Sequence, residues 1–350
     1  MIVYGGVLIA LGFIFLLYNS NLARSRRVKN LLYALAWLIL LLVSGLRYEV
    51  GTDYPHYIRN YSMYMNQSIS LVNQPAMTVV AWVSSIIYDD YATWFFLMAM
   101  ITMIPAGKAI KRDSSTVCMS TVLFVLLCCW HTSFNIVKQS AAMAFIMLGS
   151  KNLMDRKFGK WCLYCALAAM FHISAVLMIP MYFLIDNQVN WKRCLLMAAS
   201  GLVIMILYDE LFGLMGILRG TFSETSETGY GARDLNILRV LVNCAPIAMA
   251  LVMRKYYDLK EKRFAVLFNL SFFNAVLNIA TMSSAYLNRF AIYTIPFNAL
   301  FIPYLVKPFK RKSRVIIWCV ILVLYAAFFA YDLYKGSTTR TFHWIFERGY

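Results

Sequence analysis

The apolar run LLYALAWLILLLV at residues 31–43 decides the fold class of this chain, and the polar stretch SGLRYEVGTDYPHYIRNYSMY at residues 44–64 follows it directly. Runs of this kind recur along the 350 residues, of which 61% are hydrophobic and 14% charged. A soluble domain of this length cannot bury so much apolar surface in one core. The sequence therefore predicts an all-α, polytopic integral membrane protein.

Apolar runs between residues 2 and 331 give about 10–12 transmembrane or re-entrant helices. A full crossing needs about 20 helical residues, and several of the runs are shorter. We expect a single polytopic membrane domain over residues 1–350, with external loops at 44–74 and 213–236. The basic excess of 33 Lys and Arg over 16 Asp and Glu sits in short clusters between the apolar runs, which favours membrane orientation rather than nucleic-acid binding.

The basic clusters define the expected orientation. Six of them are expected to be cytoplasmic: 24–29, 108–112, 151–160, 192–193, 254–263 and 307–314. An odd number of crossings must then separate residues 47 and 108, so the short run at 75–88 is expected to be re-entrant or interfacial. The long run at 161–185 must contain an even number of crossings, so we expect it to be broken near His172 into two half-helices. Alternatively, Lys192 and Arg193 lie on the outer side.

Seven basic residues break this pattern because they fall on the expected outer side: Arg47, Arg59, Lys138, Arg219, Arg233, Arg239 and Arg289. A charged side chain at membrane depth is costly and usually lines a polar cavity. Arginines that converge on one side indicate an anion, with phosphate as the natural candidate. For Arg59, Arg219 and Arg239, snorkelling to the interface explains the position equally well. Arg47 and Arg289 have polar neighbours, which favour a functional role.

Candidate proton acceptors are few. Asp53 lies in the turn sequence Gly51-Thr52-Asp53-Tyr54, where it is either a catalytic carboxylate or a structural cap. His172 stands alone in an apolar run and is either a proton carrier or a buried hydrogen-bonding residue. Asn135, Lys138 and Gln139 share one helical face that could line a cavity.

Several enzyme classes have no support in the sequence. It contains no Walker, GxGxxG, HExxH or GxSxG motif and no DxD pattern. None of the eight cysteines forms a four-ligand zinc spacing, and we expect neither a cofactor nor a metal.

Four segments in order resemble the EpsG-like family of Wzy-type exopolysaccharide polymerases: LRYEVGTDYPHY (46–57), FNIVKQSAAMAFIMLGSKNLMDRKFGKW (134–161), ALAAMFHISAVLMIP (166–180) and AYLNRFAIY (285–293). The VGTDY element is the most specific of them. One departure concerns Lys138, which stands where we expect an arginine before Gln; it keeps the charge but lacks the bidentate fork.

The resemblance implies that the protein polymerises oligosaccharide repeat units carried on undecaprenyl diphosphate, at the outer face of the bacterial cytoplasmic membrane. Such a reaction needs cations for the leaving diphosphate and a base for the sugar hydroxyl. The expected catalytic residues are Asp53, Arg47, Arg289 and His172, with Asp53 or His172 as the base. The expected substrate-binding residues are Glu49, Tyr54, Tyr57, Asn135, Lys138, Gln139, Arg233, Tyr286 and Asn288.

The expected partners are the lipid-linked oligosaccharide and membrane lipid, with a chain-length regulator or a flippase as candidate protein partners. Two alternatives remain open. The protein could transport lipid-linked oligosaccharide without chemistry, with its arginines guiding the diphosphate. It could instead be a membrane O-acyltransferase of surface glycans that centres on a histidine such as His172.

Overall fold

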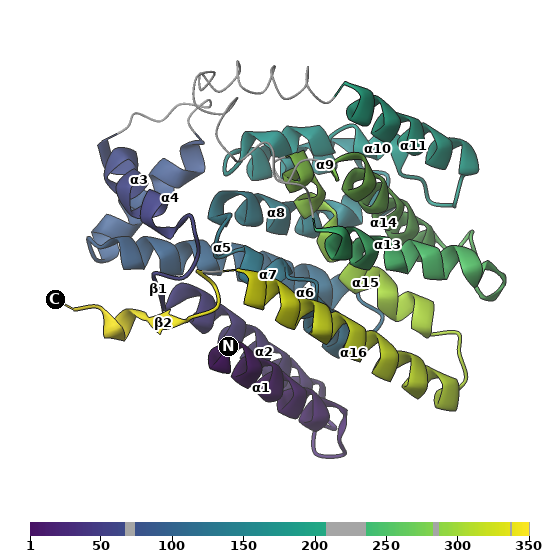
Figure 1. The fold of residues 1–350 in the computed structure, drawn as a ribbon, viewed down its shortest axis with the longest axis horizontal. Helices are drawn as coiled ribbons and strands as arrows, with labels where there is room; N and C mark the ends of the chain where they lie inside the picture. Colours follow the sequence, from purple (N-terminus) through teal and green to yellow (C-terminus); the bar gives the residue numbers. More distant parts are fainter. Residues whose placement is uncertain (67–73, 208–235, 283–286, 337, 350) are drawn as a thin grey trace.

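The computed structural model is a bundle of helices of unequal length (Figure 1), and it describes residues 1–66, 74–207, 236–282, 287–336 and 338–349. The α-helices are α1 (Ile2–Asn19), α2 (Arg26–Gly45), α3 (Tyr54–Asn66), α4 (Pro75–Ile87), α5 (Tyr91–Asp113), α6 (Val117–Leu126), α7 (Cys129–Thr132), α8 (Val137–Met154), α9 (Phe158–Ala169), α10 (Met181–Leu184), α11 (Trp191–Ile206), α13 (Ile237–Val252), α14 (Lys262–Ala280), α15 (Ile295–Val306) and α16 (Arg311–Lys335). The 3₁₀ helices are η2 (Ile173–Met178), η3 (Arg254–Tyr256), η4 (Leu287–Tyr293) and η5 (Ile345–Glu347), and the two strands are β1 (Arg47–Tyr48) and β2 (His343–Trp344).

The all-α, polytopic membrane fold is confirmed. Within the described residues, five helices are long and apolar enough to cross a membrane: α1, α2, α5, α14 and α16. A sixth span results if η4 and α15, which meet at a bend of 49°, are counted together. With the four shorter apolar helices, these elements reach the lower end of the expected range. The loop expected at 213–236 lies outside the described residues except for Asn236, and so does the 67–73 part of the loop expected at 44–74.

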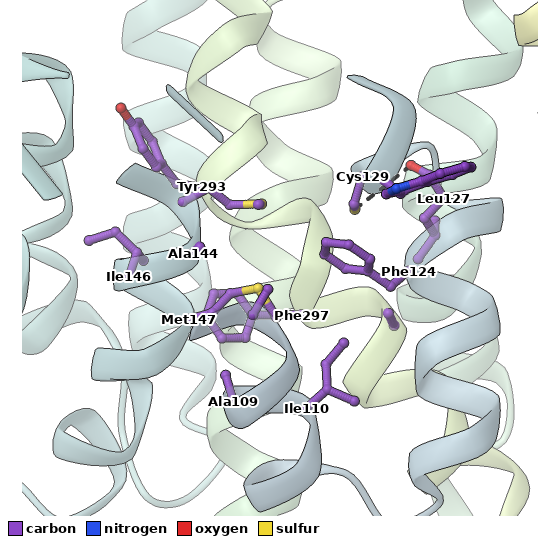
Figure 2. Packing of buried hydrophobic residues seen from close by; sticks show 14 of the residues in the cluster. Ala109, Ile110, Phe124, Leu127, Cys129, Ala144, Ile146, Met147, Tyr293 and Phe297 are labelled. Carbon is purple, nitrogen blue, oxygen red and sulfur yellow. Dashed lines mark hydrogen bonds between the residues drawn. The ribbon is translucent and has the colours of Figure 1, made fainter. Parts of the chain in front are cut away.

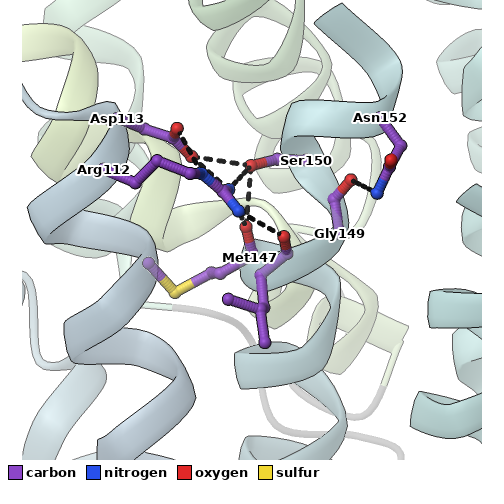
Figure 3. A network of polar contacts seen from close by, with 7 residues as sticks. Arg112, Asp113, Met147, Gly149, Ser150 and Asn152 are labelled. Carbon is purple, nitrogen blue, oxygen red and sulfur yellow. Dashed lines mark hydrogen bonds and ion pairs between the residues drawn. The ribbon is translucent and has the colours of Figure 1, made fainter. Parts of the chain in front are cut away.

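The basic clusters near the start of the chain lie at one end of the bundle. The Tyr33 hydroxyl donates to the Gly107 carbonyl at 2.8 Å, which joins the start of α2 to the last turns of α5. Arg112 pairs with Asp113 at 2.6 Å, and its Nη1 donates to the Leu148 carbonyl at 2.8 Å. Figure 3 shows this arginine reaching from α5 to α8. The clusters at 24–29, 108–112 and 151–160 are therefore neighbours.

The later basic clusters join the same end. Lys262 pairs with Asp155 at 3.8 Å, which places the start of α14 beside the end of α8. The Tyr257 hydroxyl donates to the Leu305 carbonyl at 2.9 Å, which brings the end of α15 to the same place. We call this the basic end of the bundle.

The expected break near His172 is confirmed. α9 ends shortly before His172, which adopts an extended conformation, and η2 begins directly after it. The chain then returns, because Arg156 Nη1 donates to the carbonyls of Tyr182 and Ile185, each at 2.8 Å. Arg193 also donates to the Ile185 carbonyl, at 3.2 Å, so the cluster at 192–193 lies at the basic end. The even number of crossings that the charges required is met by two half-helices.

α4 likewise behaves as a partial crossing. Its 13 residues span about 20 Å, less than the roughly 30 Å of a bilayer core. Beyond its C-terminus, Asp89 accepts a hydrogen bond from Tyr61 of α3 at 2.9 Å. At its N-terminus, the Ala76 amide donates to the Met170 carbonyl at 3.2 Å, beside the break in the other half-helix pair. α4 therefore runs between that break and α3. Among the described residues between 47 and 108, α5 is the helix that is long and apolar enough for a full crossing.

The opposite end of the bundle carries both chain termini and the small sheet. β1 pairs antiparallel with β2. The Met1 amino group donates to the Arg340 carbonyl at 2.8 Å, and Arg348 pairs with Asp90 at 2.7 Å, just before α5. We call this the strand end. It gathers the start of α1, the end of α2, the start of α5 and the end of α16 (Figure 1).

The core lies between the helices that converge around α8. Buried side chains from α5, α6, α8 and α15 fill the space between them, including Ile110, Phe124, Met147 and Phe297 (Figure 2). By contrast, α1 and α16 keep rows of exposed apolar side chains, as expected for surfaces in contact with lipid.

Candidate active site at the strand end

A cavity of about 460 Å³, lined in part by charged and amide side chains, opens at the strand end. Its wall comes from six places in the chain: the turn before α3, the α6–α7 junction, the start of α8, the start of α13, η4 and the end of α16. The polar and charged lining residues are Thr52, Asp53, His131, Thr132, Asn135, Ser140, Asn236, Arg239, Asn243, Asn288, Arg289, Asp332, Lys335 and Thr339. Four predicted site residues are among them: Asp53, Asn135, Asn288 and Arg289.

The turn that carries Asp53 depends on glycine. Gly51 has a φ of +114°, and a Cβ atom there would lie 2.7 Å from Asn135 Oδ1 and 2.9 Å from the Phe134 carbonyl oxygen. Asn135 Oδ1 accepts from the Thr52 amide at 2.6 Å and from the Thr52 hydroxyl at 3.2 Å. The backbone before α3 therefore packs directly against the start of α8.

This arrangement bears on whether Asp53 caps its own turn. Among the described residues, none donates a hydrogen bond to the Asp53 carboxylate, and Asn135 holds the turn instead. The half-buried carboxylate thus lines the cavity with its acceptor sites available to a ligand. Nearby, burial raises the pKa of Tyr57, and the Asp53 charge raises it further. Tyr57 is therefore a neutral neighbour of Asp53 at physiological pH.

η4 holds Asn288 and Arg289 at the cavity through buried amides. The Asn288 amide donates to Asn278 Oδ1 at 3.3 Å and to Thr281 Oγ1 at 3.0 Å. Gln139 Nε2 donates to the Arg289 carbonyl at 2.7 Å. A fully buried polar network specifies one geometry, because any member left without a partner costs free energy. The bend between η4 and α15 is therefore held from α8 and α14.

The amide network continues towards α13. Asn278 Nδ2 donates to Asn274 Oδ1 at 3.2 Å, and Asn274 Nδ2 donates to Asn243 Oδ1 at 3.1 Å. Asn243 itself lines the cavity. One chain of buried side chains thus links the α13 wall to the η4 wall.

Sequence reasoning missed three ionisable groups of the cavity wall as a unit. Arg239 of α13 pairs with Asp332 Oδ1, and His131 Nε2 lies 2.9 Å from Asp332 Oδ2. Sequence reasoning singled out only Arg239, as a residue equally well explained by snorkelling. The available signal was an aspartate near the end of a long apolar helix, because such a residue marks a functional site by default.

Cys128 adjoins this group, and its sulfur lies within 4.8 Å of ligand atoms of His131 and Asp332. These three residue types are suitable ligands for a transition metal. Both Asp332 oxygens, however, are already engaged by Arg239 and His131. A metal would have to displace the His131–Asp332 contact, and the ion pair with Arg239 explains the geometry without one.

Arg47, predicted to be catalytic, lies away from the cavity wall. Its side chain is 3% exposed, and its guanidinium donates to the carbonyls of Ser44 and Phe134. The guanidinium carbon lies 4.8 Å from the Phe95 ring centre and 5.1 Å from that of Phe134. Burial lowers the pKa of Arg47 to about 10, so it remains charged near neutrality. Its position is that of a structural cation beneath the turn, and the expected direct contact with a diphosphate finds no support in it.

His172 also lies outside the cavity wall. Its Nδ1 is 2.6 Å from Ser174 Oγ, which is 2.8 Å from the Tyr293 hydroxyl. The bonds tie the break between the half-helices to the end of η4. A role as catalytic base stays a prediction for His172, and its observed contacts match the alternative of a buried hydrogen-bonding residue.

The other predicted residues that the structure describes do not line the cavity. Tyr54 stacks on Phe95 at 4.4 Å, and Gln139 acts on the backbone of Arg289. The cavity lining also does not include the exposed Glu49, the buried Tyr57 or the half-buried Lys138. Arg233 and Tyr286 lie outside the described residues. Their expected contacts with a substrate stay predictions.

Comparison with known proteins gives one positive result. The model of the EpsG family matches residues 30–345, which covers nearly the whole chain from α2 to the C-terminal tail. The chain therefore belongs to the EpsG family, which indicates a polymerase-like role in exopolysaccharide synthesis. No curated protein and no solved structure matches the chain.

Proposed function

We propose that this member of the EpsG family is a membrane glycosyltransferase that joins oligosaccharide repeat units into a surface polysaccharide. The donor is a repeat unit on undecaprenyl diphosphate, and the acceptor is the sugar end of a second lipid-linked unit. The observation that carries the proposal is that Asp53 and Arg289, from segments far apart in the sequence, line one cavity. They supply a proton acceptor and a cation, the two groups that the reaction needs.

Asp53 and Arg289 together account for the proton and the charge in the glycosyl-transfer step. The acceptor hydroxyl attacks the anomeric carbon of the donor and gives its proton to the Asp53 carboxylate. The bond between that carbon and the diphosphate oxygen breaks, and the lipid diphosphate leaves with the electron pair. The Arg289 guanidinium stabilises the charge that develops on it. Asn135 and Asn288, on the same wall, offer amide groups to sugar hydroxyls.

The location of the cavity supports an outward-facing site. The six basic clusters gather at the basic end, which the positive-inside rule assigns to the cytoplasm. The cavity lies at the strand end, where Thr52 and Lys335 border it. We therefore propose that the reaction occurs at the outer face of the bacterial cytoplasmic membrane, where a lipid-linked repeat unit presents its sugar.

The alternatives draw less support from the geometry. An acyltransferase centred on His172 needs that imidazole at the ligand, but it bonds Ser174 and lies off the cavity wall. A transporter needs cations to guide the diphosphate, and Arg289 would suit it equally. The cavity carboxylate Asp53 and the family membership favour chemistry over transport.

The test uses purified protein in lipid nanodiscs with a synthetic lipid-linked repeat unit, a chelator and no nucleotide. Products of two or more repeats are expected. Asp53→Asn should reduce the rate by about 100-fold or more, since it removes the base. Asp89→Asn is the matched control, because Asp89 lies off the cavity wall and an amide oxygen can still accept from Tyr61. If Asp53→Asn and Arg289→Ala both elongate normally in vitro while repeat units fail to reach the outer face of cells, transport is the function.

A further inference from the structure

We propose that Arg239 is an anion-binding residue of the strand-end cavity and that Asp332 is the residue that positions its guanidinium. The inference deepens the proposed function, on which it rests in one respect: the natural anion would be the diphosphate of the lipid donor. The binding of a diphosphate group at this arginine can be measured separately from polymerisation.

The first argument is the direction of the guanidinium. Arg239 uses Nη2 for its ion pair with Asp332, yet its side chain is 30% exposed and lines the cavity. Among the described residues, no protein group accepts a hydrogen bond from its Nη1 or Nε. A guanidinium fixed through one nitrogen keeps donors in a planar fork, the geometry that binds phosphate oxygens in pairs.

The second argument is that Asp332 is itself fixed. A carboxylate only accepts hydrogen bonds, so His131 Nε2, 2.9 Å from Asp332 Oδ2, must carry the proton. The other ring nitrogen of His131 is buried and has no hydrogen-bond partner among the described residues. His131 also packs edge-on against Phe329, with 5.2 Å between ring centres. The carboxylate is therefore held on both oxygens, and the arginine that it holds is preorganised.

The third argument is the charge of the other residues that line the cavity with Arg239. Arg289 from η4 and Lys335 from the end of α16 line the same space. A cavity with three cations and two carboxylates, Asp53 and Asp332, carries a net positive charge and attracts a polyvalent anion. Phosphate and diphosphate groups are the chemical class that fits.

The competing explanation is that the pair only fastens α16 to α13. A partly buried ion pair is a poor choice for that purpose, since apolar residues of similar volume often stabilise as well or better. This difference makes the two explanations separable by experiment.

The decisive variant is the double substitution Arg239→Met and Asp332→Leu, which removes both charges and keeps an apolar contact between the helices. Binding is measured in nanodiscs with three probes: inorganic pyrophosphate, undecaprenyl diphosphate and undecaprenol. We expect the wild-type protein to bind both diphosphate probes more tightly than undecaprenol. The double variant should keep its thermal stability and bind the diphosphate probes about tenfold more weakly or worse, the loss expected for one charge-assisted contact.

The matched control is the same replacement in the ion pair at the basic end, Arg112→Met with Asp113→Leu, which should leave the binding of all probes unchanged. Arg239→Lys keeps the charge and serves if the double variant is unstable; it should weaken binding several-fold, because it loses the fork. Asp332→Asn should weaken binding less than the loss of the arginine, and Asp332→Glu should recover part of the affinity. A purely structural pair would change the melting temperature in these variants without changing affinity.

The binding results distinguish a lipid-linked anion from a soluble one. They also distinguish a failure of this inference from a failure of the proposed function. Arg239-dependent binding of undecaprenyl diphosphate supports a lipid head group, and Arg239-dependent binding of pyrophosphate alone supports a soluble diphosphate. If the double variant binds both probes as the wild type does, the inference is wrong even if polymerisation is observed. If Arg239-dependent binding is found but the wild type makes no polymer, the inference stands and the proposed function fails.

Discussion

The side-chain oxygen of Asn135 accepts hydrogen bonds from both the backbone amide and the hydroxyl of Thr52, a residue 83 positions earlier in the chain. Two segments of the family match are thereby joined directly at the cavity. The turn that presents Asp53 is positioned from the start of α8, and its own aspartate remains available to a ligand.

Removal of this acceptor should impair the site without unfolding the protein. Asn135→Ala removes the acceptor of the exposed Thr52 amide, at a cost of about 0.5–1.5 kcal/mol for one hydrogen bond. If this loss disturbs the geometry of the active site, the polymerisation rate should fall by up to about tenfold. The measurement is the rate of repeat-unit addition in nanodiscs. Asn66→Ala is the control, since the Asn66 side chain bonds only the Ser62 carbonyl of its own helix among the residues that the structure describes. Equal rates for the two variants would show that the turn keeps its geometry without Asn135.

Gly51→Ala should be more damaging than Asn135→Ala. The new Cβ atom would meet Asn135 Oδ1 at 2.7 Å, and the φ of +114° is unfavourable for an L side chain. We expect a loss of unfolding free energy of about 1–3 kcal/mol together with loss of polymerisation. Gly12→Ala in α1 is the control, because its Cβ has nothing within 4 Å and alanine favours helix. A Gly51→Ala protein as stable and active as the control would contradict the observed turn.

Charge parity along the sequence predicted two of the less regular features of this fold. The break near His172 and the partial crossing by α4 both follow from counting crossings between basic clusters, because insertion constrains where Lys and Arg lie. Hydropathy alone would have drawn one long helix over 161–185. The bend between η4 and α15, in contrast, depends on a buried amide network whose members come from α8, α13 and α14, and local sequence does not reveal such pairings.

The candidate site also combines residues that the sequence identifies with residues that only the tertiary fold reveals. The VGTDY turn and Asn288-Arg289 could be identified, since polar residues at helix ends in an apolar chain are few. Sequence could not distinguish Arg47, which packs against Phe95 and Phe134, from an arginine that faces a cavity. It also could not join His131 to Asp332 across 201 residues, because only the tertiary fold brings them together.

Cysteine labelling tests the orientation on which the outer-face proposal depends. His56→Cys on the exposed side of α3 should react with a membrane-impermeant maleimide in intact cells. Lys260→Cys, exposed at the basic end, should react only after the membrane is opened. The protein without an introduced cysteine gives the background from the eight native thiols. The reverse pattern would place the cavity in the cytoplasm.

Arg47 provides a test between its expected and its observed role. The structure predicts that Arg47→Met destabilises the fold, because it leaves the carbonyls of Ser44 and Phe134 without their donor and removes contacts with two aromatic rings. The expected loss of unfolding free energy is about 2 kcal/mol or more, seen as a lower melting temperature in detergent.

Arg59→Met serves as the control for Arg47→Met, because Arg59 is exposed on the neighbouring helix α3 and its one hydrogen bond among the described residues is with His56. Its melting temperature should stay close to that of the wild type, since surface substitutions rarely change stability by more than about 0.5 kcal/mol. One combination of results would instead support the sequence-based prediction that Arg47 contacts the diphosphate. If Arg47→Met melts like Arg59→Met but binds undecaprenyl diphosphate more weakly, the guanidinium must reach the ligand, and the turn around Gly51 must open to let it do so.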